Sequence, residues 1–337
     1  MDKKDLNYNK INKMYGYMKH NMPVDTFMEK FGFNEKEVYG LVEICKSFGK
    51  KIELVYDGKV LVFSKNKKIM PSTSKLPVDS EKLNHIELCV VSDTHLGNNH
   101  QQLHLLNNVY EEAYNRGIRT VLHAGDLSDG NYTNRPESYY EQFIHGFDEH
   151  ADYIIEWYPK VDGIKTLFIS GNHDFTNNRN NGATLGKWIS EKRDDLEYLG
   201  QDNHTVVINK VKIMLDHPGG GSAKSISYKL QQKIEGMEST HKPNALITGH
   251  YHKSYYMLYN NVHALLAPAL CDYTPFQKRM GLSNDLGAYF IDIYADKNGR
   301  IQYFEPEEIR FDRKDVWDEV GKDKRKVKKL EIKNGVY

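Results

Sequence analysis

The chain has 337 residues, of which 39% are hydrophobic and 27% charged, and its 46 basic and 46 acidic residues cancel, a composition typical of a soluble globular protein. It has no run near the ~18 apolar residues that a membrane-spanning helix needs, and it begins without the apolar stretch of a signal peptide, so we expect a cytoplasmic protein. The 3 cysteines are scattered, which argues against a disulfide framework and against a cysteine-based zinc site.

The balanced net charge conceals an uneven distribution along the chain. Residues 1–68 contain 14 lysines, no arginine and 9 acids, and residues 310–337 contain 10 basic and 6 acidic residues. The remaining residues, 69–309, contain 22 basic and 31 acidic residues. Two basic ends around an acidic body suggest that the ends meet a polyanion. Lysine-rich surfaces that only aid solubility would explain the same distribution.

Residues 1–68 predict three short helices followed by a hairpin. Apolar residues recur at three- and four-residue spacing over residues 8–20, 23–32 and 34–48. Asn34 and Glu37 predict a capping box at the start of the third helix. Two β-rich runs then flank Asp57-Gly58, a dipeptide typical of hairpin turns.

This order of elements resembles a winged helix-turn-helix domain. In that family the third helix enters the major groove of DNA and the wing contacts the phosphate backbone. The resemblance implies binding with little sequence specificity, because the domain offers lysines and no arginine. A module for protein docking or dimerisation is the alternative. The lysines implied to contact phosphates are Lys36, Lys46, Lys50, Lys51, Lys59, Lys65, Lys67 and Lys68.

Beyond a predicted linker at residues 69–84, which contains Pro71 and Pro77, strands alternate with helices and then follow one another closely. Strands joined through helices are expected to run parallel and to carry functional side chains at their carboxyl ends. We expect an α/β (α+β) fold, a two-sheet β-sandwich flanked by helices, at residues 85–309, and a basic, flexible or helical tail at residues 310–337. Strands are predicted at 86–91, 120–122, 166–169, 196–199, 204–208, 211–216, 245–248, 254–259, 262–267, 287–294 and 300–304, and helices near 103–113, 137–158, 185–192 and 223–235.

Polar clusters follow the apolar strands at five points. A strand presents alternate side chains on one face, so Asp93 and His95 can point the same way where the first strand ends. His217 directly ends a strong apolar run, whereas its rivals His204 and His241 do not. Imidazoles with carboxylates and an amide oxygen suit Mn, Fe, Co, Ni or Zn, because an all-oxygen site would favour Mg or Ca. The clusters are Asp93-Thr94-His95, Gly125-Asp126, Gly171-Asn172-His173-Asp174, His217 and Gly249-His250-Tyr251-His252.

This ordered set resembles the calcineurin-like metallophosphoesterase superfamily over about residues 86–270. The resemblance implies two divalent ions, with Mn²⁺ as the first expectation, and attack of a metal-activated water on phosphorus. His173 follows the implied ligand Asn172 but is not a ligand in this family, and we predict that it is the general acid and that Asp174 holds its ring and raises its pKa. We expect His123 to orient a metal ligand without taking part in catalysis. The implied ligands are Asp93, His95 and His252 for one ion, Asn172, His217 and His250 for the other, and Asp126 as the bridge.

Two differences argue against a protein phosphatase. Those enzymes carry an arginine where this chain has Gly130 and a glutamate where it has Asp174. The motifs look closer to the repair-nuclease and phage phosphoesterase branch. We therefore predict a metal-dependent phosphodiesterase or nuclease acting on nucleic acid. The alternatives are a phosphoesterase for nucleotides or cyclic nucleotides, and a non-catalytic DNA- or protein-binding regulator.

Two further segments are candidates for substrate contact. Residues 219–222 with Lys224 open a predicted helix and could present N–H groups to a phosphate, although a plain flexible turn explains the glycines equally well. Aromatic side chains between Tyr251 and Phe276 could stack on bases, although strand tyrosines more often serve packing.

Overall fold

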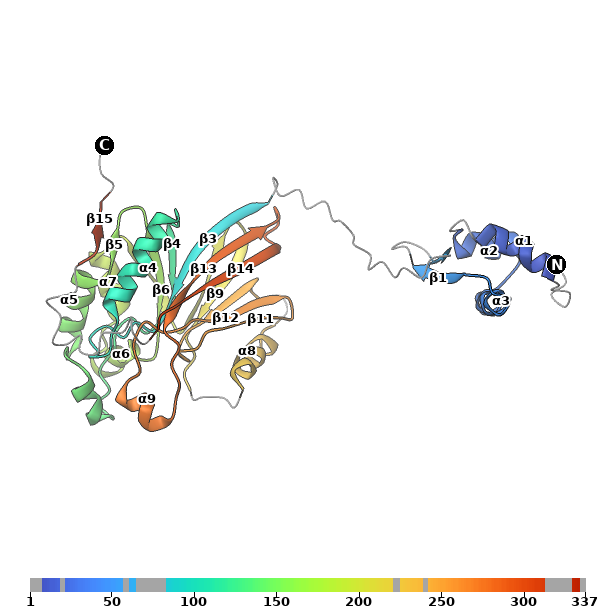
Figure 1. Ribbon diagram of the computed structural model, residues 1–337. Coiled ribbons are helices and arrows are strands. Elements are labelled where there is room, and N and C mark those ends of the chain that lie inside the picture. Colours follow the sequence, from blue (N-terminus) through green and yellow to red (C-terminus); the bar gives the residue numbers. More distant parts are fainter. Residues whose placement is uncertain are drawn as a thin grey trace. The chain divides into compact units, whose positions relative to one another are not determined.

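The chain divides into two compact units, residues 1–79 and residues 80–337 (Figure 1). Their boundary lies inside the predicted linker. The computed structural model describes residues 8–18, 22–56, 61–64, 83–220, 225–238, 242–312 and 329–333.

The described part of the N-terminal unit consists of three helices and an antiparallel hairpin, as predicted. The capping box is confirmed, because Asn34 Oδ1 accepts a hydrogen bond from the Glu37 N–H at 3.0 Å and Glu37 Oε2 accepts one from the Asn34 N–H at 2.8 Å. The predicted Asp57-Gly58 turn lies outside the described residues. The elements are α1 (Tyr8–Met18), α2 (Val24–Phe31), α3 (Glu35–Ser47), β1 (Glu53–Tyr56) and β2 (Leu61–Ser64).

This unit has an apolar core of its own. Phe27 of α2 is fully buried, and its ring centroid lies 4.6 Å from that of Phe31 and 5.0 Å from that of Phe63 in β2. Val38 and Leu41 of α3 belong to the same cluster. The hairpin and the helices are therefore held together by one aromatic and aliphatic cluster.

The larger unit contains a six-stranded sheet with β3 beside its centre. Strands β3, β4, β6 and β7 run parallel to one another, whereas β13 and β14 are antiparallel to their neighbours. The second half of β3 is buried at every position, which explains why its sequence is continuously apolar. In spatial order the strands are β14 (Ile301–Arg310), β13 (Gly287–Ala295), β3 (Asn84–Val91), β4 (Thr120–His123), β6 (Lys165–Ser170) and β7 (Leu196–Gln201).

A second sheet has five strands and is also mixed. Strand β10 is parallel to β9 and β12, and the outer strands β8 and β11 are antiparallel. The strands in spatial order are β11 (Tyr255–Tyr259), β12 (Val262–Leu266), β10 (Ala245–Thr248), β9 (Val211–Asp216) and β8 (Asn203–Ile208).

The two sheets share one apolar cluster, to which Val90 and Ile169 of the first sheet and Ile213 and Ile247 of the second belong. A separate cluster joins three helices to the other face of the first sheet, and a smaller one joins a fourth helix to the second sheet. The predicted mixed α/β fold with sheets flanked by helices is confirmed (Figure 1). The helices are α4 (Leu103–Asn115), α5 (Phe147–Trp157) and α7 (Leu185–Lys192) on the first sheet and α8 (Ile226–Glu235) on the second.

The single helix predicted over residues 137–158 is wrong. The chain forms a short 3₁₀ helix, η3 (Pro136–Glu141), and then α5, with Gly146 between them at a φ of 89°. A left-handed glycine at this point separates the two helices. Helices α6 (Phe175–Asn181) and α9 (Pro275–Met280) were not predicted, because each is short and lacks a clear apolar repeat.

The expected flexible or helical tail is wrong for residues 329–333. Strand β15 (Glu331–Ile332) pairs in parallel with β5 (Lys160–Val161). Leu330 and Ile332 pack against the core of the larger unit, which explains why this segment is ordered against it. Residues 313–328, with most of the basic block, lie outside the described residues.

None of the helices in the described ranges combines the length and the hydropathy needed to cross a membrane.

Candidate metal centre

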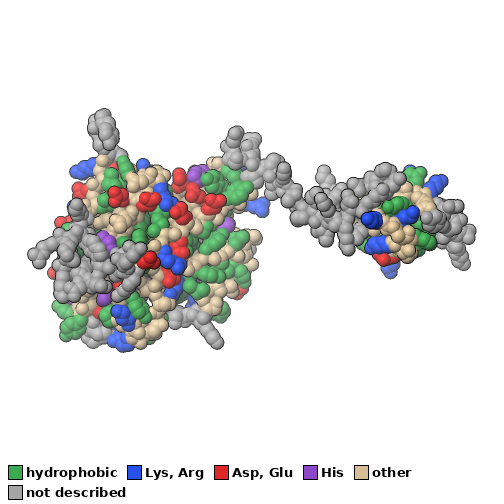
Figure 2. Space-filling view, viewed as in Figure 1, with side chains coloured by type: hydrophobic (Ala, Val, Ile, Leu, Met, Phe, Trp, Pro, Cys, Tyr) green, Lys and Arg blue, Asp and Glu red, His purple; other side chains and the backbone are tan. Residues whose placement is uncertain are grey.

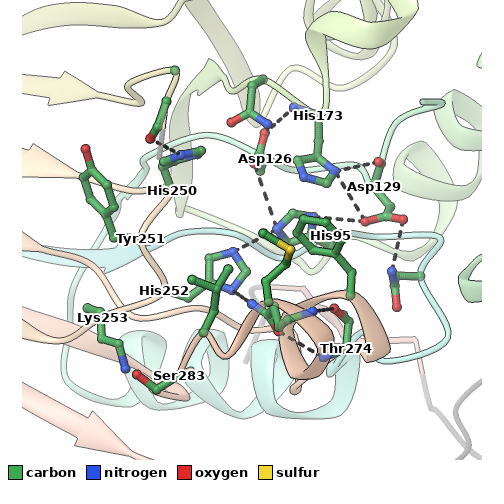
Figure 3. A pocket seen from close by; sticks show the side chains of 18 of the residues that line it. His95, Asp126, Asp129, His173, His250, Tyr251, His252, Lys253, Thr274 and Ser283 are labelled. Atoms are coloured by element: carbon green, nitrogen blue, oxygen red, sulfur yellow. Dashed lines mark hydrogen bonds and ion pairs between the residues drawn. The ribbon is translucent and has the colours of Figure 1, made fainter. Parts of the chain in front are cut away.

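Polar side chains gather where strands of both sheets end (Figure 3). Asp93 and Asp126 follow β3 and β4 of the first sheet, and His217 and His250 follow β9 and β10 of the second. Because these strands are parallel within each sheet, their carboxyl ends lie at one edge and the loops leaving them meet. The side chains brought together are Asp93, His95, Asp126, Asn172, His173, His217, His250 and His252.

Five of these residues have left-handed backbone conformations. Their φ angles are 50° at Asp93, 41° at His95, 56° at Asp126, 76° at His250 and 52° at His252. Such a conformation costs a non-glycine residue on the order of 1 to 2 kcal/mol and persists only where the surrounding structure enforces it. The concentration of strain in one set of loops marks them as a functional site.

The first group of donor atoms consists of Asp93, His95 and His252. His252 Nε2 lies 3.3 Å from Asp93 Oδ1 and 3.2 Å from His95 Nε2. His95 Nε2 is 3.9 Å from Asp93 Oδ1. Three donors within 4.8 Å of one another form a group that could hold a divalent ion.

The second group consists of Asp126, His217 and His250, also within 4.8 Å of one another. His217 Nε2 lies 3.0 Å from Asp126 Oδ2 and 3.2 Å from the amide oxygen of Asn172. Asp126 Oδ2 is also 4.0 Å from His95 Nε2 in the first group. The two groups therefore correspond to the predicted ligand sets, and Asp126 lies between them.

Hydrogen bonds orient two of these imidazole rings. His217 Nδ1 lies 2.7 Å from the Ala124 carbonyl oxygen, and His95 Nδ1 lies 3.1 Å from Asp129 Oδ1. Both oxygens can only accept, so each Nδ1 carries a hydrogen, and in the neutral ring each Nε2 lone pair faces the centre. The Nδ1 of His252 contacts the side-chain amides of Asn284 and Gln277 at 2.9 and 2.8 Å. His250 differs, since its Nε2 contacts the Gly220 carbonyl at 3.1 Å and its Nδ1 is left for the centre.

The protonation equilibria reflect the crowding of carboxylates and imidazoles. Burial disfavours the charged form of His217, but the adjacent Asp126 carboxylate raises the pKa of His217 to about 9. Burial also opposes ionisation of Asp126, yet His217 and His173 hold the pKa of Asp126 well below its usual value. Burial and the nearby His217 lower the pKa of His250 to about 4. A cation at this centre would thus meet carboxylates that are already ionised.

Gly171 leaves room for the side chains of Asp126 and His217. A Cβ atom at this position would contact Asp126 Oδ1 and lie 2.6 Å from His217 Nε2. The donor atoms of the two groups are nitrogen and oxygen, the mixed set that suits Mn, Fe, Co, Ni or Zn. The residues present therefore fit two divalent ions that share one carboxylate.

The predicted contact between Asp174 and the His173 ring is wrong. The Asp174 carboxylate accepts hydrogen bonds from the N–H groups of Leu127, Ser128 and Gly171 at 3.1, 2.8 and 3.0 Å, so it ties the loop after β4 to the loop after β6. Asp174 faces these backbone groups because the chain begins to turn into α6 immediately after it. Its part is to position the two loops that carry Asp126 and His173.

Asp129 takes the place that was assigned to Asp174. The Nδ1 of His173 lies 2.8 Å from the Asp129 carbonyl oxygen and 3.5 Å from the Asp129 carboxylate, so Nδ1 carries a hydrogen and Nε2 is the free nitrogen. Burial disfavours the charged ring, but the carboxylates of Asp126 and Asp129 hold the pKa of His173 well above its usual value. Asp129 was missed by the sequence reasoning. Its signal was an acid three positions after Asp126 in the same loop.

Of the three other histidines considered from the sequence, the two that the structure describes, His123 and His204, are not among the donor groups of the centre. His123 is buried, and its Nδ1 accepts a hydrogen bond from the Gly125 N–H at 3.2 Å while its Nε2 contacts the Thr94 hydroxyl at 3.2 Å. Burial lowers the pKa of His123 to about 3. It therefore braces, as a neutral ring, the loops that carry Asp93 and Asp126. His204 is exposed, and His241 lies outside the described residues.

The glycine-rich segment gives little support to the proposed N–H cradle. Helix α8 begins at Ile226, and Gly220 offers its carbonyl to His250. Residues 221–224, including Lys224, lie outside the described residues.

Metal binding to the metal-free protein is expected to release about one proton at pH 7. His217, with a pKa of about 9, is protonated at that pH and must become neutral to bind a cation, whereas His250, with a pKa of about 4, is already neutral. The affinity should therefore rise about tenfold per pH unit between pH 7 and 9 and level off above it. Calorimetric titration with Mn²⁺ in buffers of different ionisation enthalpy measures the release, and a pH-independent affinity would contradict it.

Asp129→Asn is expected to weaken metal affinity about 10- to 100-fold, because the His95 ring loses the carboxylate that fixes its Nδ1 hydrogen. Asp152→Asn, on the exposed side of α5, is the matched control and should bind as the unaltered protein does. The affinity is compared by measuring the metal content of each variant after dialysis against increasing concentrations of a chelator. Equal retention by both variants would show that Asp129 does not support the centre.

The family profile described as "Calcineurin-like phosphoesterase superfamily domain" matches residues 86–268, which is more than half of the chain. No curated protein sequence matches the chain. Similar solved structures include a novel archaeal phosphodiesterase, with 14% identity, a TM-score of 0.38 and coverage of 66% of this chain and 100% of that one. The phosphoesterase Yfce from E. coli shows 14% identity, a TM-score of 0.35 and coverage of 65% and 98%, and a 5'-nucleotidase precursor from Thermus thermophilus shows 11% identity, a TM-score of 0.38 and coverage of 71% and 57%. The profile match spans the five polar clusters that meet at the ends of the two sheets, and the chain belongs to the calcineurin-like phosphoesterase superfamily.

Proposed function

We propose that the larger unit is a dinuclear metal-dependent phosphodiesterase that acts on nucleic acid. The observation that carries the proposal is the pairing of two donor groups about Asp126 with a histidine, His173, whose Nε2 makes no hydrogen bond to any residue that the structure describes. Phosphate esters resist hydrolysis for two reasons. The negative charge on the phosphate oxygens repels the attacking nucleophile, and an unprotonated alkoxide is a poor leaving group. Cations bound by the two donor groups would offset the repulsion, and a nearby proton donor would protonate the leaving oxygen.

The chain's own residues would divide the work as follows. Asp93, His95 and His252 would hold one ion, Asn172, His217 and His250 would hold the other, and Asp126 would serve both. Such ions would supply Lewis acidity toward the phosphate oxygens and toward the attacking water. His173 gives a proton from Nε2 to the leaving oxygen, and Asp129 fixes its ring through Nδ1.

The centre opens into a cavity of about 800 Å³, within the size range of sites for small organic ligands. His95, Asp126, His173 and His250 line it (Figure 3). The apolar side chain of Phe276 also belongs to its lining. An apolar wall beside a charged centre suits a group that carries a base next to its phosphate. The size of the cavity also supports the second candidate, a phosphoesterase for nucleotides or cyclic nucleotides.

The N-terminal unit is proposed as a winged-helix module that holds the polymer. Its excess of lysine over acid supports this role, as do the mostly basic charged side chains on the face seen in Figure 2. The larger unit shows acidic side chains gathered on its upper part in the same view, so it attracts a polyanion less by itself.

The exposed side of α3 is not uniformly basic, which weakens the assignment of this helix to the major groove of DNA. Lys46 is paired with Glu43 at 2.8 Å, and Tyr39 and Ile44 are 49% and 38% exposed on the same helix. Such a mixed face also suits a protein partner. Lys59, Lys65, Lys67 and Lys68, which were predicted to contact phosphates, lie outside the described residues.

Removal of residues 1–79 is expected to weaken the affinity for single-stranded or duplex DNA strongly and to reduce its salt dependence, because the lysine contacts to phosphates are lost. Fluorescence anisotropy of labelled DNA, with the full chain and the shortened chain at several salt concentrations, measures both quantities. Equal affinity and equal salt dependence would refute the role of this unit in nucleic-acid binding and favour the protein-docking alternative.

The reaction is tested with the Mn²⁺-supplemented full chain on DNA, RNA, cyclic nucleotides and bis-p-nitrophenyl phosphate. His173→Gln is expected to lower kcat on the natural esters by about 100- to 10,000-fold, since an alkoxide must be protonated as it leaves. The loss on bis-p-nitrophenyl phosphate should be much smaller, because p-nitrophenolate leaves without a proton.

His204→Gln, at an exposed position, is the control and should retain full activity. Metal content must be equal in all samples, so that a loss of ions is not read as a loss of the acid. Equal losses on all substrates would contradict the acid role of His173. Cleavage of cyclic nucleotides alone would favour the second candidate, and no cleavage at all would leave the non-catalytic regulator.

A further inference from the structure

One cation in the cavity is held by aromatic rings. Arg135 lies in the loop between β4 and η3 and lines the cavity. The centre of its guanidinium lies 4.5 Å from the ring centroid of Tyr132 and 4.7 Å from that of Phe276. Tyr132 belongs to the same loop, whereas Phe276 belongs to α9, so the two rings grip the arginine from separate segments.

The hydrogen-bonding edge of this guanidinium is unused within the described residues, where no side-chain or carbonyl oxygen accepts from it at hydrogen-bond or ion-pair distance. Neither ring offers an oxygen or nitrogen acceptor lone pair to the cation, so these contacts do not replace hydrogen bonds from the guanidinium N–H groups. Other arginines of this unit use that edge. Arg116 donates to Glu307 at 2.6 and 3.0 Å, and Arg193 donates to Asp195 at 2.6 Å. Arg135 therefore presents a rigid, free fork of donors to the cavity.

Tyr132 contacts Arg135 and also two residues of the candidate metal centre, Asn172 and His173. The Tyr132 hydroxyl accepts a hydrogen bond from Asn172 Nδ2 at 2.7 Å, and its ring centroid lies 4.8 Å from that of His173. Asn172, His173 and Arg135 therefore all contact the same tyrosine. An anion bound by Arg135 would lie near the phosphate under attack.

We propose that Arg135 binds a second phosphate of the substrate, next to the one that is hydrolysed. The inference rests on the proposed phosphodiesterase function and narrows its substrate class to chains with at least two phosphates, such as an oligonucleotide end. A planar, always charged fork matches phosphate oxygens in a bidentate manner. Phe276 and Tyr132 hold the fork in place, so little side-chain entropy is lost when the phosphate binds.

The experiment compares three kinds of substrate of the Mn²⁺-loaded full chain: bis-p-nitrophenyl phosphate, a dinucleotide, and two forms of the same dinucleotide that carry an extra phosphate at one end or at the other. The unaltered protein should prefer one of the phosphorylated forms. Arg135→Gln should raise the KM of that form about 10- to 100-fold, the range for a lost hydrogen bond to a charged group, and leave bis-p-nitrophenyl phosphate nearly unchanged. Arg135→Lys should fall between the two, because it keeps the charge and loses the fork.

Arg279→Gln is the matched control. Arg279 also contacts the Phe276 ring, with the centre of its guanidinium 5.8 Å from the ring centroid. Its side chain is exposed and does not line the cavity, so Arg279→Gln should leave the substrate preference intact. The proposal is overturned if the extra phosphate confers no preference, or if Arg135→Gln slows all three kinds of substrate equally, as a packing defect would.

Failure of the proposed function is distinguishable from failure of this inference. If the unaltered protein cleaves none of the substrates, the phosphodiesterase proposal falls, and equilibrium binding of the phosphorylated dinucleotide then decides on Arg135. Tighter binding by the unaltered protein than by Arg135→Gln supports the anion site, and equal binding overturns it.

Discussion

The fold of the larger unit depends on a buried carboxylate, that of Asp126, which is 1% exposed at the junction of the two sheets. A buried charge is costly unless it is paired and hydrogen-bonded. Asp126 accepts a hydrogen bond from the His173 N–H at 2.8 Å and lies 3.0 Å from the His217 ring. Asp93, also fully buried, is close enough that each carboxylate opposes the ionisation of the other. Positive charge at this junction, whether imidazolium or metal, therefore stabilises the fold and creates the site at once.

The backbone around Asp126 shows what this arrangement demands. Five of the candidate ligand residues leave their strands in left-handed conformations, at a cost in local strain. The neighbouring Gly171 and Gly249 leave no room for a Cβ, since one at Gly249 would lie 3.0 Å from His217 Nδ1. Two packed sheets are rigid enough to impose such geometry, which a flexible loop alone would relax. The sandwich therefore acts as the frame for the strained loops.

Around the centre, the supporting contacts come from residues that are not themselves donors to the ions. Asp129 contacts the rings of His95 and His173 and also accepts hydrogen bonds from Asn98 and Gln142 at 3.0 and 2.6 Å. Gln277 of α9 contacts His252, and its neighbour Phe276 packs on Arg135. Helix α9 thus contacts both the candidate ligand His252 and the guanidinium of Arg135.

Local sequence patterns determined much of this protein. Continuous apolar runs indicated the buried parallel strands, and polar residues directly after them indicated Asp93, His95, Asp126, Asn172 and His217 as neighbours, because parallel strands end at a common edge. Tertiary structure alone decided the rest. The acid beside His173 is Asp129 and not the adjacent Asp174, since the turn into α6 aims Asp174 at backbone N–H groups. Arg135 contacts Phe276 from a segment far away in the chain, and no periodicity records such a contact, because it arises only when the loop after β4 packs against helix α9.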